Sequence, residues 1–213
     1  MGLIVPFSSS EIEFIERKSR FIGNVWLVNS EEEAKRHIEE TYQKHPTAAH
    51  GVYCYDIKAE NVSRYNDNGE PKGTAGLPMF EVFRREGVTN YCCIATRYFG
   101  GILLGAGGLV RAYAATAKLA LDAAGIAELC TYLEVTILCE YTHFNIIKAY
   151  LQDKEHTEID IEYGADVTYT ICIPEESFDV IQAGVIECTA GRSELLISGT
   201  RQIPVRRETK GSK

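Results

Sequence analysis

Five glycines lie within nine residues, 100–108, between an apolar strand-like run and an alanine-rich helix-like run. The run before them is Asn90–Thr96 and the run after them is Leu109–Ala124. Glycine loses more backbone entropy on folding than any other residue, so such a cluster is unfavourable unless the chain needs it. Glycine is typical of positions with positive φ or with a second backbone or a ligand very close by. The cluster therefore predicts either a binding loop or close packing of helix on sheet.

The residues just before the helix-like run Leu109–Ala124 favour an anion-binding loop. Backbone N–H groups at a helix start near Gly107 can form a nest for an anion. Two arginines stand beside it: Arg97 at the entrance to the loop and Arg111 in the helix. At about 100° per residue, the helix splits into a buried face of Leu109, Val110, Tyr113, Ala117, Ala120 and Leu121 and an opposite face of Arg111, Ala115, Lys118 and Asp122. Paired guanidinium groups suit a phosphate or a carboxylate. If the arginines instead cap carbonyl groups, the glycines serve packing alone.

A second unusual loop, Arg64–Pro78, carries an Asn68-Gly69 turn. A hydrolase could use His50 as a base, with Asp67 or Glu70 as its partner or as a metal ligand. Asp and Asn are, however, common in turns because they bond the local backbone. No nucleophile stands in a recognisable elbow. We therefore prefer a non-catalytic protein and keep His50, Asp67 and Glu70 as the catalytic alternative.

The two loops together define a predicted binding site. No G-K-[ST] follows the glycines, and no G-x-G-x-x-G spacing occurs, so neither ATP nor NAD is expected and no cofactor or metal is predicted. Tyr98 and Phe99 could stack on bases or belong to the core. The predicted anion- or nucleic-acid-binding residues are Lys72, Gly73, Thr74, Arg97, Gly105, Gly107, Gly108 and Arg111.

The first half of the chain is predicted to be mixed α/β. Ser30 can cap a helix whose first turn is acidic, and Gly125 suits the residue after a helix end. Hydrophobic patterning predicts strands over Phe21–Val28, Gly51–Ile57, Val62–Tyr65 and Asn90–Thr96, and helices over Glu31–Lys44, Pro78–Arg85 and Leu109–Ala124.

The second half shows the order β-α-β-β-α-β, which is the split-βαβ, ferredoxin-like plan. Its boundary with the first half is expected between Gly125 and Thr131. The alternating and helical patterns predict a strand over Thr131–Leu138, a helix over Tyr141–Gln152, strands over Glu158–Tyr163 and Asp166–Ile173, a helix from Pro174 to about Glu187, and a strand over Glu194–Ser198.

Charge is divided unevenly along the chain. The 213 residues hold 22 basic and 30 acidic residues, a net charge of −8, which argues against a bulk polyanion binder. Residues 1–125 hold 14 basic and 15 acidic residues, whereas residues 126–200 hold 3 basic and 14 acidic residues. The last 13 residues hold 5 basic residues and 1 acidic residue. We expect them to form a flexible basic tail. The charge distribution is therefore compatible with a local anion-binding site in the first half of the chain.

Other features favour a cytosolic protein. The seven cysteines are odd in number and form no C-x-x-C, which is typical of reduced, mostly buried thiols rather than disulfides or a zinc site. No run of 18 apolar residues exists, and Met1–Phe7 lacks the basic region and apolar length of a signal peptide. We expect a cytoplasmic location and no membrane partner.

Four segments of the chain together form a specific pattern. They are Lys18–Ile22 (KSRFI), Lys44–His50 (KHPTAAH), Arg64–Pro78 (RYNDNGEPKGTAGLP) and Thr96–Tyr113 (TRYFGGILLGAGGLVRAY). On these segments the chain resembles the IMPACT family, and within it the YigZ-like two-domain proteins, whose second domain extends the resemblance to the whole chain. Asn68 stands where the family usually has Asp, which keeps the turn but weakens any two-acid metal site.

The resemblance implies an α+β protein of two domains. Residues 1–127 would resemble domain 2 of ribosomal protein S5, residues 128–204 would be ferredoxin-like and similar to the last domain of elongation factor G, and residues 205–213 would form the tail. Eukaryotic members regulate translation in general amino-acid control, by competing for the activator of a stress kinase. The resemblance thus implies a regulator or accessory factor of translation or stress response, with RNA, the ribosome or a protein of the translation machinery as partner. A hydrolase acting on a small phosphorylated or peptide-like substrate is the alternative.

Overall fold

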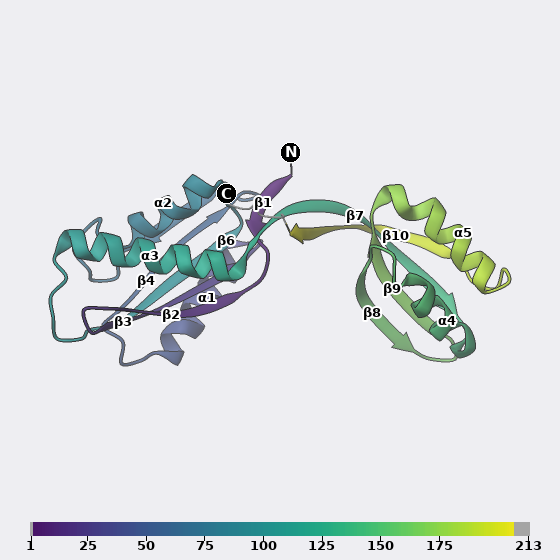
Figure 1. Cartoon of the computed structure of the whole chain (residues 1–213), viewed down its shortest axis with the longest axis horizontal. Coiled ribbons are helices and arrows are strands. Elements are labelled where there is room, and N and C mark those ends of the chain that lie inside the picture. The colour runs from purple at the N-terminus through teal and green to yellow at the C-terminus, as the bar shows by residue number, and fades with distance from the viewer. Residues whose placement is uncertain (1, 207–213) are drawn as a thin grey trace. The chain divides into compact units, whose positions relative to one another are not determined.

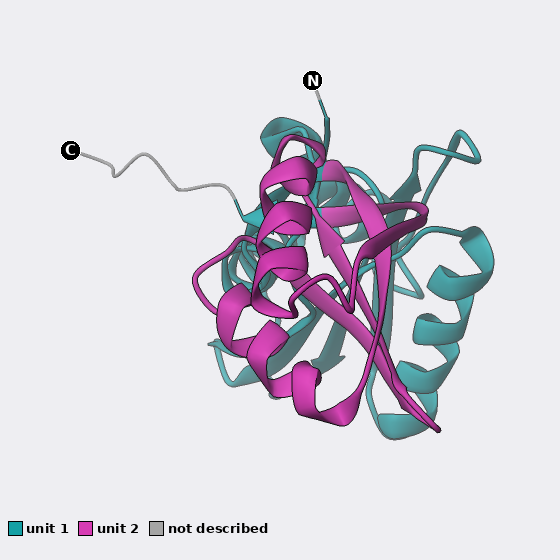
Figure 2. Cartoon of the chain, turned by 90° about the vertical axis from the view of Figure 1, so that its right-hand side faces the viewer, with its two compact units in different colours: residues 1–129, 204–213 teal, residues 130–203 magenta. Residues whose placement is uncertain are grey.

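The computed structural model describes residues 2–206 and divides the chain into two compact units. Unit 1 comprises residues 1–129 and 204–213, and unit 2 comprises residues 130–203 (Figure 2). Both units are mixed α+β and are built on antiparallel strand pairs, which agrees with the predicted class. Of the predicted basic tail, residues 207–213 lie outside the described residues. The prediction of a flexible end was wrong for residues 201–206, which belong to the strand Leu195–Arg206.

A five-stranded sheet in the order β2-β3-β6-β4-β5 forms the middle of unit 1 (Figure 1). Each neighbouring pair of strands is antiparallel. In the central strand, Arg97 stands opposite both Phe21 and His50, so these three residues share one end of the sheet. The strands are β2 (Ser10–Glu16), β3 (Ser19–Leu27), β4 (His50–Ile57), β5 (Val62–Asn66) and β6 (Tyr91–Tyr98).

Three helices cover the two faces of this sheet. Helix α1 (Glu31–Lys44) packs on one face, where Ala34 and Ile38 meet Ile94. Helices α2 (Gly76–Glu86) and α3 (Ala106–Ala124) pack on the other face and enclose the larger core. The oxygen of the Ser30 side chain accepts the Glu33 N–H at 3.2 Å, which confirms the predicted cap.

Unit 1 is completed by strand pairing between the two ends of its sequence. Strand β1 (Leu3–Pro6) pairs with the first four residues of β7 (Ile126–Cys139). Neither β1 nor β2 was predicted, although Ser10–Glu16 alternates regularly between more and less exposed residues. Helix α3 ends at Gly125, where φ is +74°, as the predicted C-terminal glycine requires.

Unit 2 follows the predicted order of elements. The later part of β7 lies between β9 (Val167–Ile173) and β10 (Leu195–Arg206), and β8 (Thr157–Tyr163) pairs with β9. Helices α4 (Tyr141–Leu151) and α5 (Phe178–Cys188) share one hydrophobic core with residues of β7, β9 and β10.

Several boundaries differ from the prediction for local reasons. Pro174 precedes a 3-10 turn, Glu175–Ser177, rather than starting an α-helix. Helix α3 begins three residues earlier than expected, and Val110 on it is 37% exposed, so its placement on the buried face was wrong. Five of the seven cysteines are buried, as predicted. Among the described residues, no helix combines the length and the apolar character needed to cross a membrane.

Candidate functional site

The two unusual loops meet at a hollow of about 510 Å³ in unit 1. The loop after β5 contributes Gly69, Glu70 and Pro71, and the loop after β6 contributes a longer stretch that runs into the first turn of α3. His50 from the start of β4 and Arg97 from the end of β6 complete the wall. The remaining lining residues are Ala49, Phe99, Leu103, Leu104, Gly105, Ala106 and Leu109.

Glu70 is the centre of a buried hydrogen-bonded network at this hollow. Its Oε1 accepts from Arg97 Nη1 at 2.5 Å and from the Tyr113 hydroxyl at 2.8 Å. The side chains of Glu70 and Arg97 are only 3% and 6% exposed, so the ion pair is shielded from water. Burial, together with the Glu70 carboxylate, raises the pKa of Tyr113, so its hydroxyl stays protonated and keeps donating.

The Arg97 guanidinium is held by polar and aromatic neighbours, although its Nε has no hydrogen-bond partner within the described residues. Its Nη2 donates to Ser19 Oγ at 3.4 Å, and the same oxygen accepts the Gly100 N–H at 3.3 Å. The guanidinium carbon lies 5.6 Å from the ring centres of both Phe21 and Phe99. Arg97 therefore organises the interior of the site instead of presenting a free charge to a ligand.

His50 presents one ring nitrogen toward Glu70. Its Nδ1 lies 2.8 Å from the carbonyl oxygen of Asn68, which can only accept, so Nδ1 carries the hydrogen. In the neutral ring, Nε2 is then a free acceptor, and it lies 3.9 Å from Glu70 Oε1. The distance is too long for a hydrogen bond but short enough for both groups to contact one small ligand.

Asp67, the third residue of the catalytic alternative, does not line the hollow. Its carboxylate accepts the backbone N–H groups of Gly73, Gly76 and Ala75 at 2.7, 2.8 and 3.1 Å. These bonds fold the loop back on itself before α2. The structure thus brings His50 and Glu70 together and assigns Asp67 to the shape of the loop.

The residues predicted to bind an anion are spread over several places. Gly105 and Arg97 line the main hollow, whereas Gly108 and Arg111 line a smaller one of about 230 Å³ together with Arg17. Thr74 is buried and its hydroxyl donates to the Pro71 carbonyl at 2.6 Å. The other predicted residues in the first loop are Lys72, which is exposed, and Gly73, which is half-buried.

Two glycines explain why the second loop needs this residue type. A Cβ on Gly100 would lie 2.0 Å from the carbonyl group of Lys18, so packing excludes any side chain there. Gly105 has φ +71° and precedes the first turn of α3, which no side chain caps. Because Gly105 and Ala106 line the hollow, the positive end of the α3 dipole lies at its edge.

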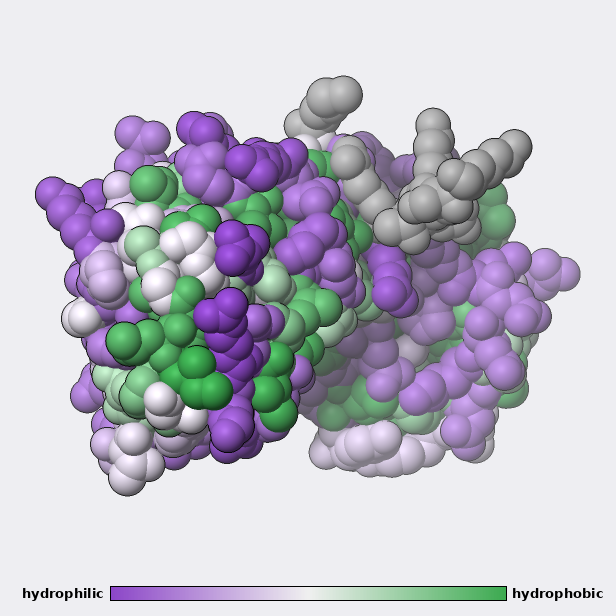
Figure 3. All heavy atoms as spheres, turned by 60° about the vertical axis from the view of Figure 1, so that its left-hand side comes forward, coloured by the Kyte–Doolittle hydropathy of each residue, from purple (hydrophilic) through white to green (hydrophobic). Residues whose placement is uncertain are grey.

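The rim of the hollow is apolar and exposed. Leu103 is 80% exposed and Phe99 is 50% exposed. Figure 3 shows apolar side chains gathered on the face that comes forward in that view. Tyr98, in contrast, is half-buried and its hydroxyl lies 2.9 Å from His45 Nδ1. Of the two aromatic residues considered for stacking, only Phe99 offers an exposed ring at the hollow.

Two residues of the network were missed as site residues. Ser19 is fully buried at the start of β3, and Tyr113 was expected only to fill the core. The role of Tyr113 could have been predicted from the sequence, because a tyrosine on the buried face of a helix needs a hydrogen-bond partner for its hydroxyl. Among residues 2–206, no group of three or more His, Cys, Asp or Glu side chains could hold a metal ion.

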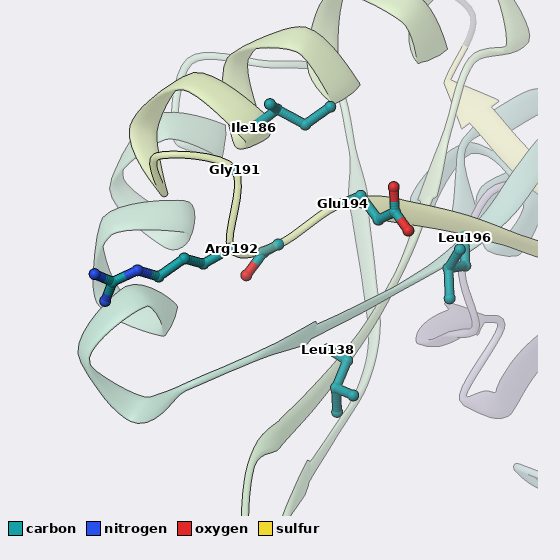
Figure 4. A pocket seen from close by; sticks show the side chains of 7 residues that line it. Leu138, Ile186, Gly191, Arg192, Glu194 and Leu196 are labelled. Carbon is teal, nitrogen blue, oxygen red and sulfur yellow. The ribbon is translucent and has the colours of Figure 1, made fainter.

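Unit 2 has a separate hollow of about 410 Å³ that contains none of the predicted site residues (Figure 4). Leu138 from β7, Leu196 from β10 and Ile186 from α5 line it. In Figure 4 the Arg192 side chain points away from the two leucines. Arg192, Ser193 and Glu194 also line it, so this hollow has a mixed apolar and polar wall.

Comparisons with known proteins define the class of this molecule. Residues 17–121 match the Impact N-terminal domain, and residues 137–192 match a domain of unknown function, DUF1949. The IMPACT family member YvyE of Bacillus subtilis strain 168 is 33% identical over 188 residues, which cover 88% of this chain and 87% of that protein. The IMPACT family member YigZ of Escherichia coli K12 is 33% identical over 183 residues, which cover 84% of this chain and 90% of that protein.

A solved structure described as that of a hypothetical protein is also similar along nearly the whole chain. It is 30% identical, has a TM-score of 0.59, and covers 92% of this chain and 98% of its own. The match therefore includes both units. This chain belongs to the IMPACT family.

Proposed function

We propose that this protein is a cytosolic regulator or accessory factor of translation that binds an anionic partner at the hollow of unit 1. Family membership supports the general role, because the resemblance to this family implies regulation of translation. We further infer that unit 1 is similar to domain 2 of ribosomal protein S5 and that unit 2 is ferredoxin-like, similar to the last domain of elongation factor G. The strand order β10-β7-β9-β8, with α4 and α5 in one core, supports the second inference.

The observation that carries the binding proposal is the composition of the hollow's edge. The uncapped start of α3 offers N–H groups and a positive dipole end, and Leu103 beside it is almost fully exposed. An acidic segment of a partner protein fits both features, with a carboxylate at the helix start and an apolar side chain against the rim. RNA phosphates would use the helix start, Lys72 and Arg111, but would leave the apolar rim unused. We therefore favour an acidic protein segment over RNA.

Capture of a partner from a cell lysate, with and without nuclease, separates these two classes. We expect the captured partner to survive nuclease treatment and to be reduced at least tenfold by Leu103→Asp, because the new carboxylate repels an acidic segment. Lys58→Ala is the matched control, since Lys58 directly follows β4 at the end opposite His50. Loss of the partner with nuclease would indicate RNA. Capture that Leu103→Asp leaves unchanged would refute binding at this hollow.

A second candidate function rests on His50 and Glu70. We infer that a hydrolase at this site would use His50 Nε2 as the base, because its Nδ1 is fixed by Asn68 and its Nε2 faces the hollow beside Glu70. The Glu70 charge is already balanced by Arg97, which argues for positioning rather than proton transfer by that carboxylate. A panel of phosphate-ester and peptide substrates tests this function. Turnover that is abolished in His50→Gln would support it, and turnover retained in that variant would exclude it.

A further inference from the structure

A hollow of about 230 Å³ is lined by the turn between β2 and β3 and by helix α3. Arg17 contributes from the turn and Arg111 from the helix, and both side chains are exposed, so a ligand can reach them. Neither guanidinium has an ion pair or a hydrogen bond with another residue among residues 2–206. The remaining lining residues are Phe14, Glu16, Leu104, Gly108, Ala112 and Ala115.

The two residues of the turn adopt a backbone conformation that their residue types disfavour. Glu16 pairs with Ser19, so Arg17 and Lys18 form a two-residue turn. Their φ angles are +45° and +63°. Such turns favour Asn-Gly, because asparagine and glycine adopt positive φ at the least cost. Backbone strain retained at two basic residues indicates that their side chains serve something other than the turn itself.

The turn is held against the glycine loop that leads into α3. Ser19 Oγ accepts the Gly100 N–H at 3.3 Å. Gly100 packs so closely on Lys18 that an added Cβ would lie 2.0 Å from the Lys18 carbonyl group. Arg17 therefore extends from a fixed backbone position, which lowers the entropy cost of holding a ligand between the turn and the helix.

The Arg111 side chain runs back toward the start of its own helix. Its Nη1 lies 3.7 Å from the position that a Cβ on Gly107 would take. The first turn of α3 has no acidic residue and no side-chain cap, so this guanidinium lies beside the positive end of the helix dipole. An anion in contact with Arg111 would relieve that repulsion.

The charges of the wall favour a ligand with more than one negative charge. Arg17 and Arg111 contribute two positive charges, whereas Glu16 contributes one negative charge and forms no ion pair with either arginine. The donor fork of a guanidinium matches the oxygens of a phosphate. A phosphoryl group at the end of a monoester carries nearly two negative charges at neutral pH, so it gains from both arginines.

We propose that this hollow binds the terminal phosphoryl group of a phosphate monoester. Arg17 and Arg111 would donate N–H groups to its oxygens from opposite walls, one on the turn and one on the helix. The site is separate from the hollow at which the acidic partner is proposed to bind, and it does not depend on that function.

Titration with inorganic phosphate at constant ionic strength, followed by NMR of the arginine Nε–Hε resonances, tests this site. We expect saturable shifts of the Arg17 and Arg111 resonances with about millimolar affinity. Arg17→Ala and Arg111→Ala should each weaken phosphate binding at least tenfold, and Glu16→Gln should strengthen it because a repelling charge is removed. Arg84→Ala is the matched control, since that exposed arginine is paired with Glu81 on α2, and it should bind phosphate like the unaltered protein.

Arg17→Asn separates ligand binding from the formation of the turn. Asparagine adopts positive φ more readily than arginine, so this variant should raise the midpoint of thermal unfolding. It should nevertheless bind phosphate at least tenfold more weakly. Weaker binding together with a lowered midpoint would mean that Arg17 serves the fold, and would overturn its role in the site.

Two further probes identify the kind of phosphate. Ribose 5-phosphate carries a monoester, whereas an oligoribonucleotide without terminal phosphates carries only diesters. We expect ribose 5-phosphate to bind at least as tightly as inorganic phosphate and the oligoribonucleotide to bind at least tenfold more weakly. Preferred binding of the oligoribonucleotide would assign the hollow to the RNA backbone and overturn the proposal.

Three results with inorganic phosphate would also overturn the proposal. They are the absence of a saturable shift, an equal response to chloride, and unchanged binding in Arg111→Ala. Two variants separate this test from that of the acidic partner. Leu103→Asp should lose the partner and keep the phosphate response, whereas Arg111→Ala should lose the phosphate response and keep the partner.

Discussion

Glu70 and Arg97 form a buried ion pair at 2.5 Å, although they lie 27 residues apart in the sequence. The pair joins the loop that precedes α2 to the central strand of the sheet. Its partners, Tyr113 from α3 and Ser19 from β3, extend the connection to two more elements. The network therefore fixes both unusual loops at the place where they form the hollow.

Removing one member of this pair should be strongly destabilising. Arg97→Met leaves the Glu70 carboxylate buried without a counter-charge, which typically costs about 3–5 kcal/mol. The double variant Arg97→Met, Glu70→Gln should recover part of that loss because no charge is left unpaired. Urea unfolding of the three proteins measures the difference. A loss below about 1 kcal/mol in Arg97→Met would mean that water reaches the pair.

Asp67 should affect stability rather than turnover. Asp67→Ala removes the acceptor of three backbone N–H groups, and we expect a loss of about 3 kcal/mol with faster hydrogen exchange at Gly73 and Gly76. Asp122→Ala is the control, since that carboxylate is exposed and paired with Lys118, and it should change stability by less than about 1 kcal/mol. An Asp67→Ala protein of full stability would contradict the structural role.

Two glycines of the cluster at residues 100–108 should respond in opposite ways to alanine, because one lies in the loop and the other in helix α3. Gly100→Ala places a Cβ 2.0 Å from the Lys18 carbonyl and should cost about 3 kcal/mol or more. Gly107 lies inside α3, where the nearest atom to an added Cβ is Arg111 Nη1 at 3.7 Å. Gly107→Ala should therefore leave stability unchanged or raise it by up to about 1 kcal/mol. Thermal unfolding compares the two, and equal losses would contradict the packing difference.

His45 should make stability depend on pH. Its pKa is lowered in the folded state from the ordinary value of 6.5, chiefly by burial. Between the two pKa values the unfolded chain binds more protons, so stability rises with pH through that range. The contribution is present above pH 6.5 and is lost as the pH falls toward the folded pKa. Urea midpoints from pH 8 to pH 5 should fall less in His45→Gln, and an equal fall in both proteins would exclude His45 as the source.

Local patterns predicted most of the elements but not the partners within the site. Helix α1 has the predicted bounds because the Ser30 cap and the acidic first turn act over adjacent residues. Strand β1 was missed because four residues carry too little periodicity and depend on pairing with residues of β7 that lie 120 to 126 positions away. Position 97 was predicted to bind a ligand. The residue that neutralises it, Glu70, is fixed only by the tertiary fold.

The same limit applies to the loops. The glycine cluster correctly indicated an unusual backbone, but it could not separate close packing at Gly100 from positive φ at Gly105. The turn chemistry of Asp67 and Asn68 was visible in the sequence, whereas the convergence of His50 with Glu70 was only a hypothesis. Chain folding supplies that convergence through the register of β4 with β6.

The salt dependence of the affinity for the captured partner tests the central claim most directly. Unit 1 is proposed to bind an acidic segment through the start of α3 and the apolar rim, so the affinity should fall only moderately with salt. Arg111→Ala should leave the salt dependence unchanged, because Arg111 lines a different hollow. Leu103→Asp should lower the affinity at least tenfold at every salt concentration. A steep, linear fall in log affinity with log salt that Leu103→Asp leaves unchanged would contradict the account and indicate phosphate binding.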